Sequence, residues 1–411
     1  MKFGSALFVA LATSSADASS LLHQRRDAGF VASGAGRSAQ LLSRSSAGGR
    51  RRGQNCASLS MRFDNSDPSR VMTLTRFMLE ETRKNPDMQD FESLMGSIQL
   101  ACKSINNLVM KAGMTNLLGL AGEVNIQGED QKKLDVLSND VLKNSLSYTG
   151  RCGVVASEEE EHPWLVEEAF QSKFVTVFDP LDGSSNVDAG IATGTIFGVF
   201  AEEEECLIPE EEANGMTINQ IRERCLIRTL QPGSNLVAAG YCLYSSSCHL
   251  FVTFGNGVQG FTLDPEVGEF VLTHPDVKIP SRGKIYSFNE GNSPDWEEGL
   301  QKYVDDVKKG QGETGKKYTS RYIGSMVGDV HRTLLYGGIF GYPSDAKNKK
   351  GKLRLLYEAA PMSFLVEQAG GKSTTGSERI LDLQPQTVHD RTPIILGSPE
   401  DVNECCKYLK E

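Results

Sequence analysis

The chain has 411 residues, with 43 Lys and Arg against 53 Asp and Glu, a formal charge of −10, and 39% hydrophobic residues. This composition is typical of a soluble globular protein of about two domains, and it excludes collagen, disulfide-scaffold and wholly disordered chains. No apolar run approaches the ~18 residues that a membrane-spanning helix needs. The acidic balance argues against a general nucleic-acid binder.

Charge divides the chain into two parts. Residues 1–60 hold eight basic and two acidic residues, a local charge of +6 that leaves −16 on the remainder. The chain begins like a signal peptide, with a basic start, an apolar stretch at residues 6–12 and the cleavage-site spacing Ala16-Asp17-Ala18. A tract of transit-peptide composition comes next, up to about residue 60. This tandem resembles the bipartite presequences of algae with complex plastids, which implies delivery to the plastid stroma. The alternative is a disordered tail that carries no targeting signal.

The first part of the remaining chain predicts helices. Apolar side chains recur every three or four residues over residues 72–84, 91–113 and 134–146, and Gly113 is placed as a helix C-cap. The Gly-punctuated residues 114–128 predict a loop between the second and third of these helices.

Short apolar and β-branched runs then predict strands at residues 174–178, 237–244, 250–254 and 260–263. Residues 353–369 predict a helix that Pro361 kinks and that Gly370-Gly371 ends. Helices and strands interleave, so the fold class is α/β or α+β. The Pro- and Gly-containing residues 277–283 indicate a domain boundary.

Asp179-Pro180-Leu181-Asp182-Gly183 is the most informative motif, because it places two carboxylates at the end of a predicted strand. Pro180 restricts the backbone, and Gly183 permits a positive φ or a close approach. The two carboxylates and the Leu181 carbonyl can converge on a hard cation, and oxygen ligands suit Mg²⁺ or Mn²⁺. The backbone amides that follow can hold a phosphate. An Asx-turn with a helix cap is the structural alternative.

Further motifs continue along the chain, at residues 128–140, 157–159, 179–186, 235–241, 284–291, 329–334 and 351–358. Together, from about residue 65 to residue 409, they resemble the class I fructose-1,6-bisphosphatase family, plastid redox-regulated type, of the lithium-sensitive sugar-phosphatase superfamily. The resemblance implies a layered αβαβα sandwich of two domains. Residues 66–277 would form an N-terminal metal-site domain with a redox insert at residues 201–230, and residues 281–411 a C-terminal substrate domain.

The resemblance also implies roles for single residues. The implied metal ligands are Glu158, Asp179, the Leu181 carbonyl, Asp182 and Glu358. Asp135 and Glu159 are the implied pair that takes a proton from the attacking water, with Asp130 in support. The implied substrate-binding residues are Gly183, Ser184, Ser185, Asn289, Arg321, Tyr322, Gly324, Ser325, Met326, Tyr342 and Lys352. Arg321 would reach in from a neighbouring subunit, which implies a homo-oligomer, the family norm being a homotetramer. Asn292 stands where the family has a tyrosine.

The implied activity is the Mg²⁺-dependent hydrolysis of fructose 1,6-bisphosphate to fructose 6-phosphate and phosphate in the Calvin cycle. Sedoheptulose-1,7-bisphosphatase, which has the same metal chemistry, is one alternative. A sugar-phosphate-binding regulator that has lost catalysis is another. That regulator predicts broken carboxylate motifs, whereas the motifs of this chain are intact.

Inhibition by AMP is expected to be weak or absent. Cytosolic relatives hold AMP with threonines and an arginine, and the matching positions here are Met88, Glu92 and Ala201. A carboxylate at residue 92 would repel the AMP phosphate.

The acidic insert implies redox regulation. Cys206 and Cys225 match two plastid cysteines whose disulfide thioredoxin reduces, while a third plastid cysteine is Leu230 here. Two separate thiols in a reducing compartment are the alternative.

Overall fold

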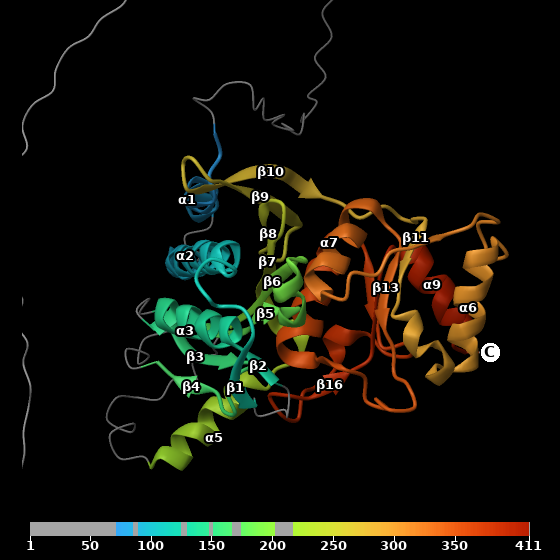
Figure 1. Cartoon of the computed structure of the whole chain (residues 1–411). Coiled ribbons are helices and arrows are strands. Elements are labelled where there is room, and N and C mark those ends of the chain that lie inside the picture. Colours follow the sequence, from blue (N-terminus) through green and yellow to red (C-terminus); the bar gives the residue numbers. More distant parts are fainter. Residues whose placement is uncertain are drawn as a thin grey trace, which may run out of the picture. The chain divides into compact units, whose positions relative to one another are not determined.

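The computed structural model describes residues 71–84, 89–124, 130–147, 151–166, 174–201 and 217–410 (Figure 1). The predicted presequence, Met88, Cys206 and much of the redox insert lie outside these ranges, and only the backbone of Asp130 is described. Within the described ranges, none of the helices combines the length and the apolar character that crossing a bilayer requires.

An eight-stranded sheet forms the first β layer, in the order β10-β9-β8-β7-β6-β5-β3-β4. Its strands are β3 (Cys152–Ser157), β4 (Trp164–Leu165), β5 (Phe174–Asp182), β6 (Thr193–Ala201), β7 (Leu236–Tyr244), β8 (Cys248–Thr253), β9 (Val258–Asp264) and β10 (Glu269–Val277). β3 and β5 are parallel, and the other neighbours are antiparallel. Every residue of β3 and β5 is buried, as expected for strands that are covered on both faces.

Three helices cover one face of this sheet: α1 (Leu74–Lys84), α2 (Gln89–Lys111) and α3 (Lys133–Ser147). Figure 1 shows them stacked beside the strands. Alternate residues of β5 serve the two faces, since Phe178 packs in the apolar cluster that contains Leu94 of α2, and Val177 packs in the opposite cluster with Tyr357. The three predicted helices are confirmed, with small shifts at their ends.

Two helices, α7 (Met326–Tyr336) and α8 (Ala360–Gln368), lie between the first sheet and a second one and contact strands of both. The second sheet has the order β12-β11-β13-β17-β15. Its strands are β11 (Ile285–Ser287), β12 (Thr319–Ser320), β13 (Ile339–Tyr342), β15 (Lys372–Thr374) and β17 (Ile394–Gly397). α6 (Glu298–Lys309) and α9 (Pro399–Tyr408) pack together on its outer face, around Tyr303 and Ile395. The layers therefore follow the predicted order αβαβα.

The predicted loop at residues 114–128 was wrong in part, because it contains a strand, β1 (Leu120–Val124), paired with β2 (Asp130–Lys132). The first residues of β1 are exposed, so no alternation of buried and exposed positions marks it as a strand. β5 also runs past its predicted end at Phe178. A bulge against β6 between Asp179 and Asp182 accommodates Pro180, which has no N–H to give to the ladder.

Residues 353–369 do not form one kinked helix, so that prediction was wrong. β14 (Leu353–Arg354) pairs with β16 (Arg391–Thr392), one π-helical turn, η8 (Leu355–Ala359), follows, and α8 then begins with Pro361 in its first turn. A proline is tolerated there because first-turn N–H groups have no helical acceptor. The π-helical turn carries Glu358.

The segment at residues 278–284 joins β10 of the first sheet to β11 of the second. The division into domains at residues 66–277 and 281–411 stays a prediction, because α7 and α8 pack against both sheets.

Gly240 of β7 is expected to be intolerant of a side chain. A Cβ there would lie 2.5 Å from the Phe251 carbonyl oxygen and 2.6 Å from the Phe197 ring. Gly240→Ala should lower the free energy of unfolding by about 1–3 kcal/mol, the usual cost of overpacking. Gly96→Ala is the matched control, because on α2 the new methyl group meets no atom within 4 Å, and it should raise that free energy by about 0.5–1 kcal/mol. Urea unfolding measures both, and wild-type stability of Gly240→Ala would contradict the prediction.

Candidate active site

A cavity of about 300 Å³ lies among β5, the loop after β3, α7, β13 and β14. The sequence-predicted residues that line it are Asp135, Glu158, Glu159, Asp179, Leu181, Asp182, Gly183, Ser184, Ser185, Tyr322, Gly324, Ser325, Met326, Tyr342, Lys352 and Glu358. The fold therefore brings together predicted residues from both sheets and from the helix layer between them.

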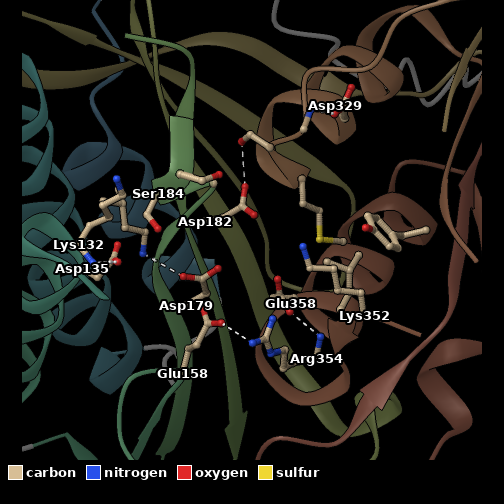
Figure 2. A pocket seen from close by; sticks show the side chains of 18 of the residues that line it. Lys132, Asp135, Glu158, Asp179, Asp182, Ser184, Asp329, Lys352, Arg354 and Glu358 are labelled. Carbon is tan, nitrogen blue, oxygen red and sulfur yellow. Dashed lines mark hydrogen bonds and ion pairs between the residues drawn. The ribbon is translucent and has the colours of Figure 1, made fainter. Parts of the chain in front are cut away.

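Asp179, Asp182 and Glu358 form the centre of the acidic side of this cavity. All three are buried, and each offers a carboxylate oxygen so that the three oxygens lie within 4.8 Å of one another. Figure 2 shows these side chains around a common space, with Glu158 next to Asp179. An all-oxygen set of this kind is what Mg²⁺ and Mn²⁺ prefer, so the residues fit a hard divalent cation.

Backbone and hydroxyl donors hold two of these carboxylates in place. The Leu181 N–H donates to Asp179 Oδ1 at 2.9 Å, and the Ser325 hydroxyl donates to Asp182 Oδ2 at 2.9 Å. Gly183, which directly follows Asp182 at the end of β5, has a φ of 73°. A Cβ at this position would lie 2.8 Å from Ser325 Cβ. Only glycine fits this close approach of β5 to the start of α7.

Burial and mutual repulsion raise the pKa values of these carboxylates. Burial raises the pKa of Glu158 to about 8, and the Glu358 charge adds to the rise while Arg354 opposes it. Burial, followed by the Glu158 charge, raises the pKa of Asp179 well above its ordinary value, and burial also raises the pKa of Asp182. Such groups stay ionised at neutral pH only beside a compensating positive charge. A divalent cation is the compensating charge that this geometry accommodates.

Asp135 and Glu159 form a second acidic pair at the edge of the cavity. Asp135, in the first turn of α3, accepts the Lys132 N–H through Oδ2 at 2.8 Å. Burial raises the pKa of Asp135 to about 7, and the Glu159 charge contributes to the rise. Glu159 in turn accepts a hydrogen bond from Gln131 Nε2. A carboxylate with a pKa near 7 is suited to accepting a proton at physiological pH.

The opposite wall of the cavity includes a loop at residues 321–325 that Asp329 holds. The Asp329 carboxylate is fully buried and accepts the N–H groups of Ile323 and Gly324 at 3.0 Å. Arg332 Nη2 donates to the same carboxylate at 2.6 Å. Asp329 thus fixes the loop that presents Tyr322 to the cavity.

Lys132, Asp329 and Arg354 line the cavity but were not among the predicted site residues. Lys132 Nζ pairs with Asp188 at 2.7 Å, and an Arg354 guanidinium nitrogen lies 3.4 Å from Glu158. All three belong to blocks that carry the family resemblance, but sequence spacing does not show which members of a block reach the cavity.

Two predicted substrate residues do not line the cavity. Asn289 accepts the Gly291 N–H at 3.3 Å at the start of η7 (Glu290–Asp295). Arg321 is exposed and donates to the Ser320 carbonyl at 2.9 Å. The approach of Arg321 to a neighbouring subunit stays a prediction.

A cleft of about 270 Å³ lies between α1 and α2, where the AMP positions were expected. It is lined by Leu74, Thr75, Met78, Glu92, Ser93, Met95, Gly96 and Gln99, none of which is basic. The described lining therefore offers no cation to an AMP phosphate, and weak AMP inhibition stays a prediction.

α5 (Ile218–Thr229) carries Cys225. The cysteine is buried in the apolar cluster that contains Val154 and Ala156 of β3, the strand that leads to Glu158. Because Cys206 lies outside the described residues, the disulfide stays a prediction.

Comparisons with known proteins cover most of the chain. Residues 72–275 match the family model of the fructose-1-6-bisphosphatase N-terminal domain, and residues 279–410 match that of the C-terminal domain. The chain is 55% identical over 339 residues to fructose-1,6-bisphosphatase, chloroplastic, of Brassica napus, covering 82% of each protein. It is also 55% identical to fructose-1,6-bisphosphatase 1, chloroplastic, of Arabidopsis thaliana, covering 82% of this chain and 81% of the relative.

A similar solved structure is that of Leishmania major fructose-1,6-bisphosphatase in holo form. It has a TM-score of 0.75 and 43% sequence identity, and the match covers 83% of this chain and 99% of that one. With both family models matched and curated relatives similar over four fifths of the sequence, the chain belongs to the fructose-1,6-bisphosphatase family.

Proposed function

We propose that this chain hydrolyses the C1 phosphate ester of fructose 1,6-bisphosphate, releasing fructose 6-phosphate and phosphate, as a Calvin-cycle enzyme of the plastid stroma. The observation that carries the proposal is one cavity in which buried carboxylates converge opposite Tyr322, Tyr342 and Lys352. The relatives named chloroplastic fructose-1,6-bisphosphatase support the substrate and the compartment.

The residues proposed to hold Mg²⁺, or Mn²⁺ in its place, are Glu158, Asp179, the Leu181 carbonyl, Asp182 and Glu358. When bound, such a cation neutralises phosphate charge and lowers the pKa of coordinated water. Asp135 and Glu159, supported by Asp130, would accept the proton of the attacking water. The pKa of Asp135, raised to about 7, supports this role.

The other cavity residues would bind and orient the sugar phosphate. Gly183, Ser184 and Ser185 follow Asp182 directly, and their N–H groups would stabilise charge on the transferred phosphate. The Tyr322 and Tyr342 hydroxyls would donate to the distal phosphate. Burial raises the pKa of Tyr322, so its hydroxyl remains a donor at neutral pH.

Six further predicted substrate residues complete the set, four of which line the cavity. Lys352 would supply a point charge to the sugar or its phosphate, and its Nζ lies 5.7 Å from the centre of the Tyr342 ring. Gly324, Ser325 and Met326 would shape the wall at the start of α7. Asn289 and Arg321 would contribute only in an assembly or after a movement, because neither lines the cavity of the single chain. We therefore propose a homotetramer in which Arg321 of one subunit serves the next.

Activity toward fructose 1,6-bisphosphate tests the proposal. Phosphate release should require Mg²⁺, with a higher kcat/KM than for sedoheptulose 1,7-bisphosphate. Asp182→Asn should lower kcat at least ~100-fold, a typical loss for a group that stabilises transition-state charge. Asp382→Asn is the control and should keep wild-type kcat, because it removes an exposed carboxylate that pairs with Arg379. Higher kcat/KM on the seven-carbon substrate would favour the alternative, and no hydrolysis of either substrate would favour a non-catalytic regulator.

Thermal stability should depend jointly on pH and Mg²⁺. Folding raises the pKa of Asp135 from 3.8 to about 7 and that of Glu158 from 4.5 to about 8. The folded state therefore binds more protons than the unfolded state in this interval, and without cations its stability falls as pH rises. Because Mg²⁺ takes the place of these protons, the rise in Tm on adding Mg²⁺ should be larger at about pH 8 than at about pH 6. Melting curves in EDTA and in Mg²⁺ measure this, and equal rises would contradict it.

Thiol activation is the proposed regulation, with thioredoxin as the partner. The thioredoxin dithiol would reduce a Cys206–Cys225 disulfide to two thiols and would itself become a disulfide. Cys225 supports it by packing with the residues of β3 that precede Glu158. Oxidised wild type should lose activity at low Mg²⁺ and regain it with dithiothreitol, whereas Cys206→Ser should be active in both conditions. Cys406→Ser, on α9, is the control and should respond like wild type. A wild type indifferent to dithiothreitol would reject this regulation.

A further inference from the structure

A segment at residues 384–392 lies beside the π-helical turn that carries Glu358. The Leu355 N–H donates to the Asp390 carbonyl at 2.7 Å. Arg354 of β14 lies opposite Arg391 of β16 in the antiparallel strand pair. The segment is therefore attached to the backbone just ahead of Glu358.

His389, in this segment, makes hydrogen bonds to residues on both sides of the carboxylate cluster. Its Nε2 lies 3.1 Å from the Glu160 carbonyl oxygen, and its Nδ1 lies 2.8 Å from the Tyr357 hydroxyl. A carbonyl oxygen only accepts, so Nε2 carries the proton and the Tyr357 hydroxyl donates to Nδ1. Glu160 directly follows Glu158 and Glu159 in the sequence.

The packing around this imidazole restricts movement of the His389 and Tyr357 rings. Tyr357 is completely buried in the apolar cluster that contains Val388, the neighbour of His389. The rings of Tyr357 and His389 meet edge to face, with centroids 5.8 Å apart. Tyr357 precedes Glu358 directly, so movement of the tyrosine would move the π-helical turn with it.

We propose that His389 is a positioning residue for the proposed metal centre, which sets the separation between the loop of Glu158 and Glu159 and the turn of Glu358. The carboxylates on these two segments repel each other, and their repulsion would move the segments apart when no cation is bound. Together with the ion pair between Arg354 and Glu158 at 3.4 Å, the imidazole opposes that movement. The inference rests on the proposed function only in that the cluster binds a divalent cation.

Direct titration of Mn²⁺ by calorimetry, with kcat and KM measured in parallel, tests the inference. His389→Ala should weaken Mn²⁺ binding about tenfold, the lower end of the ~10–100-fold effects of residues that support metal ligands. At saturating metal its kcat should stay within a few-fold of wild type, since His389 does not line the cavity. His389→Gln should recover part of the affinity, because its amide N–H replaces Nε2–H toward Glu160 while the Tyr357 hydroxyl loses its acceptor.

Tyr357→Phe provides a second variant, with Tyr241→Phe as its matched control. Each loses a 2.8 Å hydrogen bond between a tyrosine hydroxyl and a histidine Nδ1. Tyr241 lies on β7 and His331 on α7, so this pair joins neither the loop of Glu158 and Glu159 nor the turn of Glu358. Both should lower Tm, and only Tyr357→Phe should weaken Mn²⁺ binding. If His389→Ala does not fold, the two tyrosine variants decide the question.

Wild-type Mn²⁺ affinity in His389→Ala, or equal effects of the two tyrosine variants, would overturn the inference and leave His389 a purely structural residue. Failure of His389→Gln to recover affinity would overturn it as well, because the bond to Glu160 would then not be the cause. If wild type binds Mn²⁺ but releases no phosphate from fructose 1,6-bisphosphate, the proposed function fails while the positioning role is still tested by the titrations.

Discussion

Repulsion among buried carboxylates is the constraint on which the rest of this site depends. One carboxylate oxygen from each of Asp179, Asp182 and Glu358 lies within 4.8 Å of the other two in a buried cluster, and Glu158 is close enough for its pKa to respond to Glu358. Such a cluster costs stability unless positive charge compensates it. The surrounding chain must therefore resist separation of the carboxylates without filling the space that a cation needs.

The fold meets this requirement by attaching the carboxylates to separate rigid elements, two of them to β5 and the third to the turn before α8. β5 is buried along its whole length and delivers Asp179 and Asp182 at a bulge, while the turn before α8 delivers Glu358. Donors from the start of α7 hold Asp182, and Arg354 lies against Glu158. Like-charge repulsion of this kind persists only where the surrounding structure holds the groups in place, as the donors and packed elements do here.

The cavity exists because the helix layer of α7 and α8 contacts both sheets. β5 of the first sheet supplies Asp179 and Asp182 to the acidic side, whereas the later part of the chain supplies Glu358 and, on the opposite side, Tyr322, Tyr342 and Lys352. Part of the acidic surplus of the sequence thus belongs to this site, where the carboxylates can act as ligands of a divalent cation.

The sequence by itself determined the interleaved fold class, the three long helices and the carboxylate motif at the end of β5, because apolar periodicity and the Asp-Pro-Leu-Asp-Gly spacing are local signals. It did not reveal β1, whose first residues are exposed, or the strand and π-helical turn before Pro361. Glu158 and Glu159 stand in a run of four glutamates that composition alone treats as a solvated face, so only the family resemblance singled them out. The contact of His389 with Glu160 joins residues 229 positions apart. Such contacts depend on how the two sheets pack around α7 and α8, and no local pattern encodes that packing, so only the tertiary structure decided them.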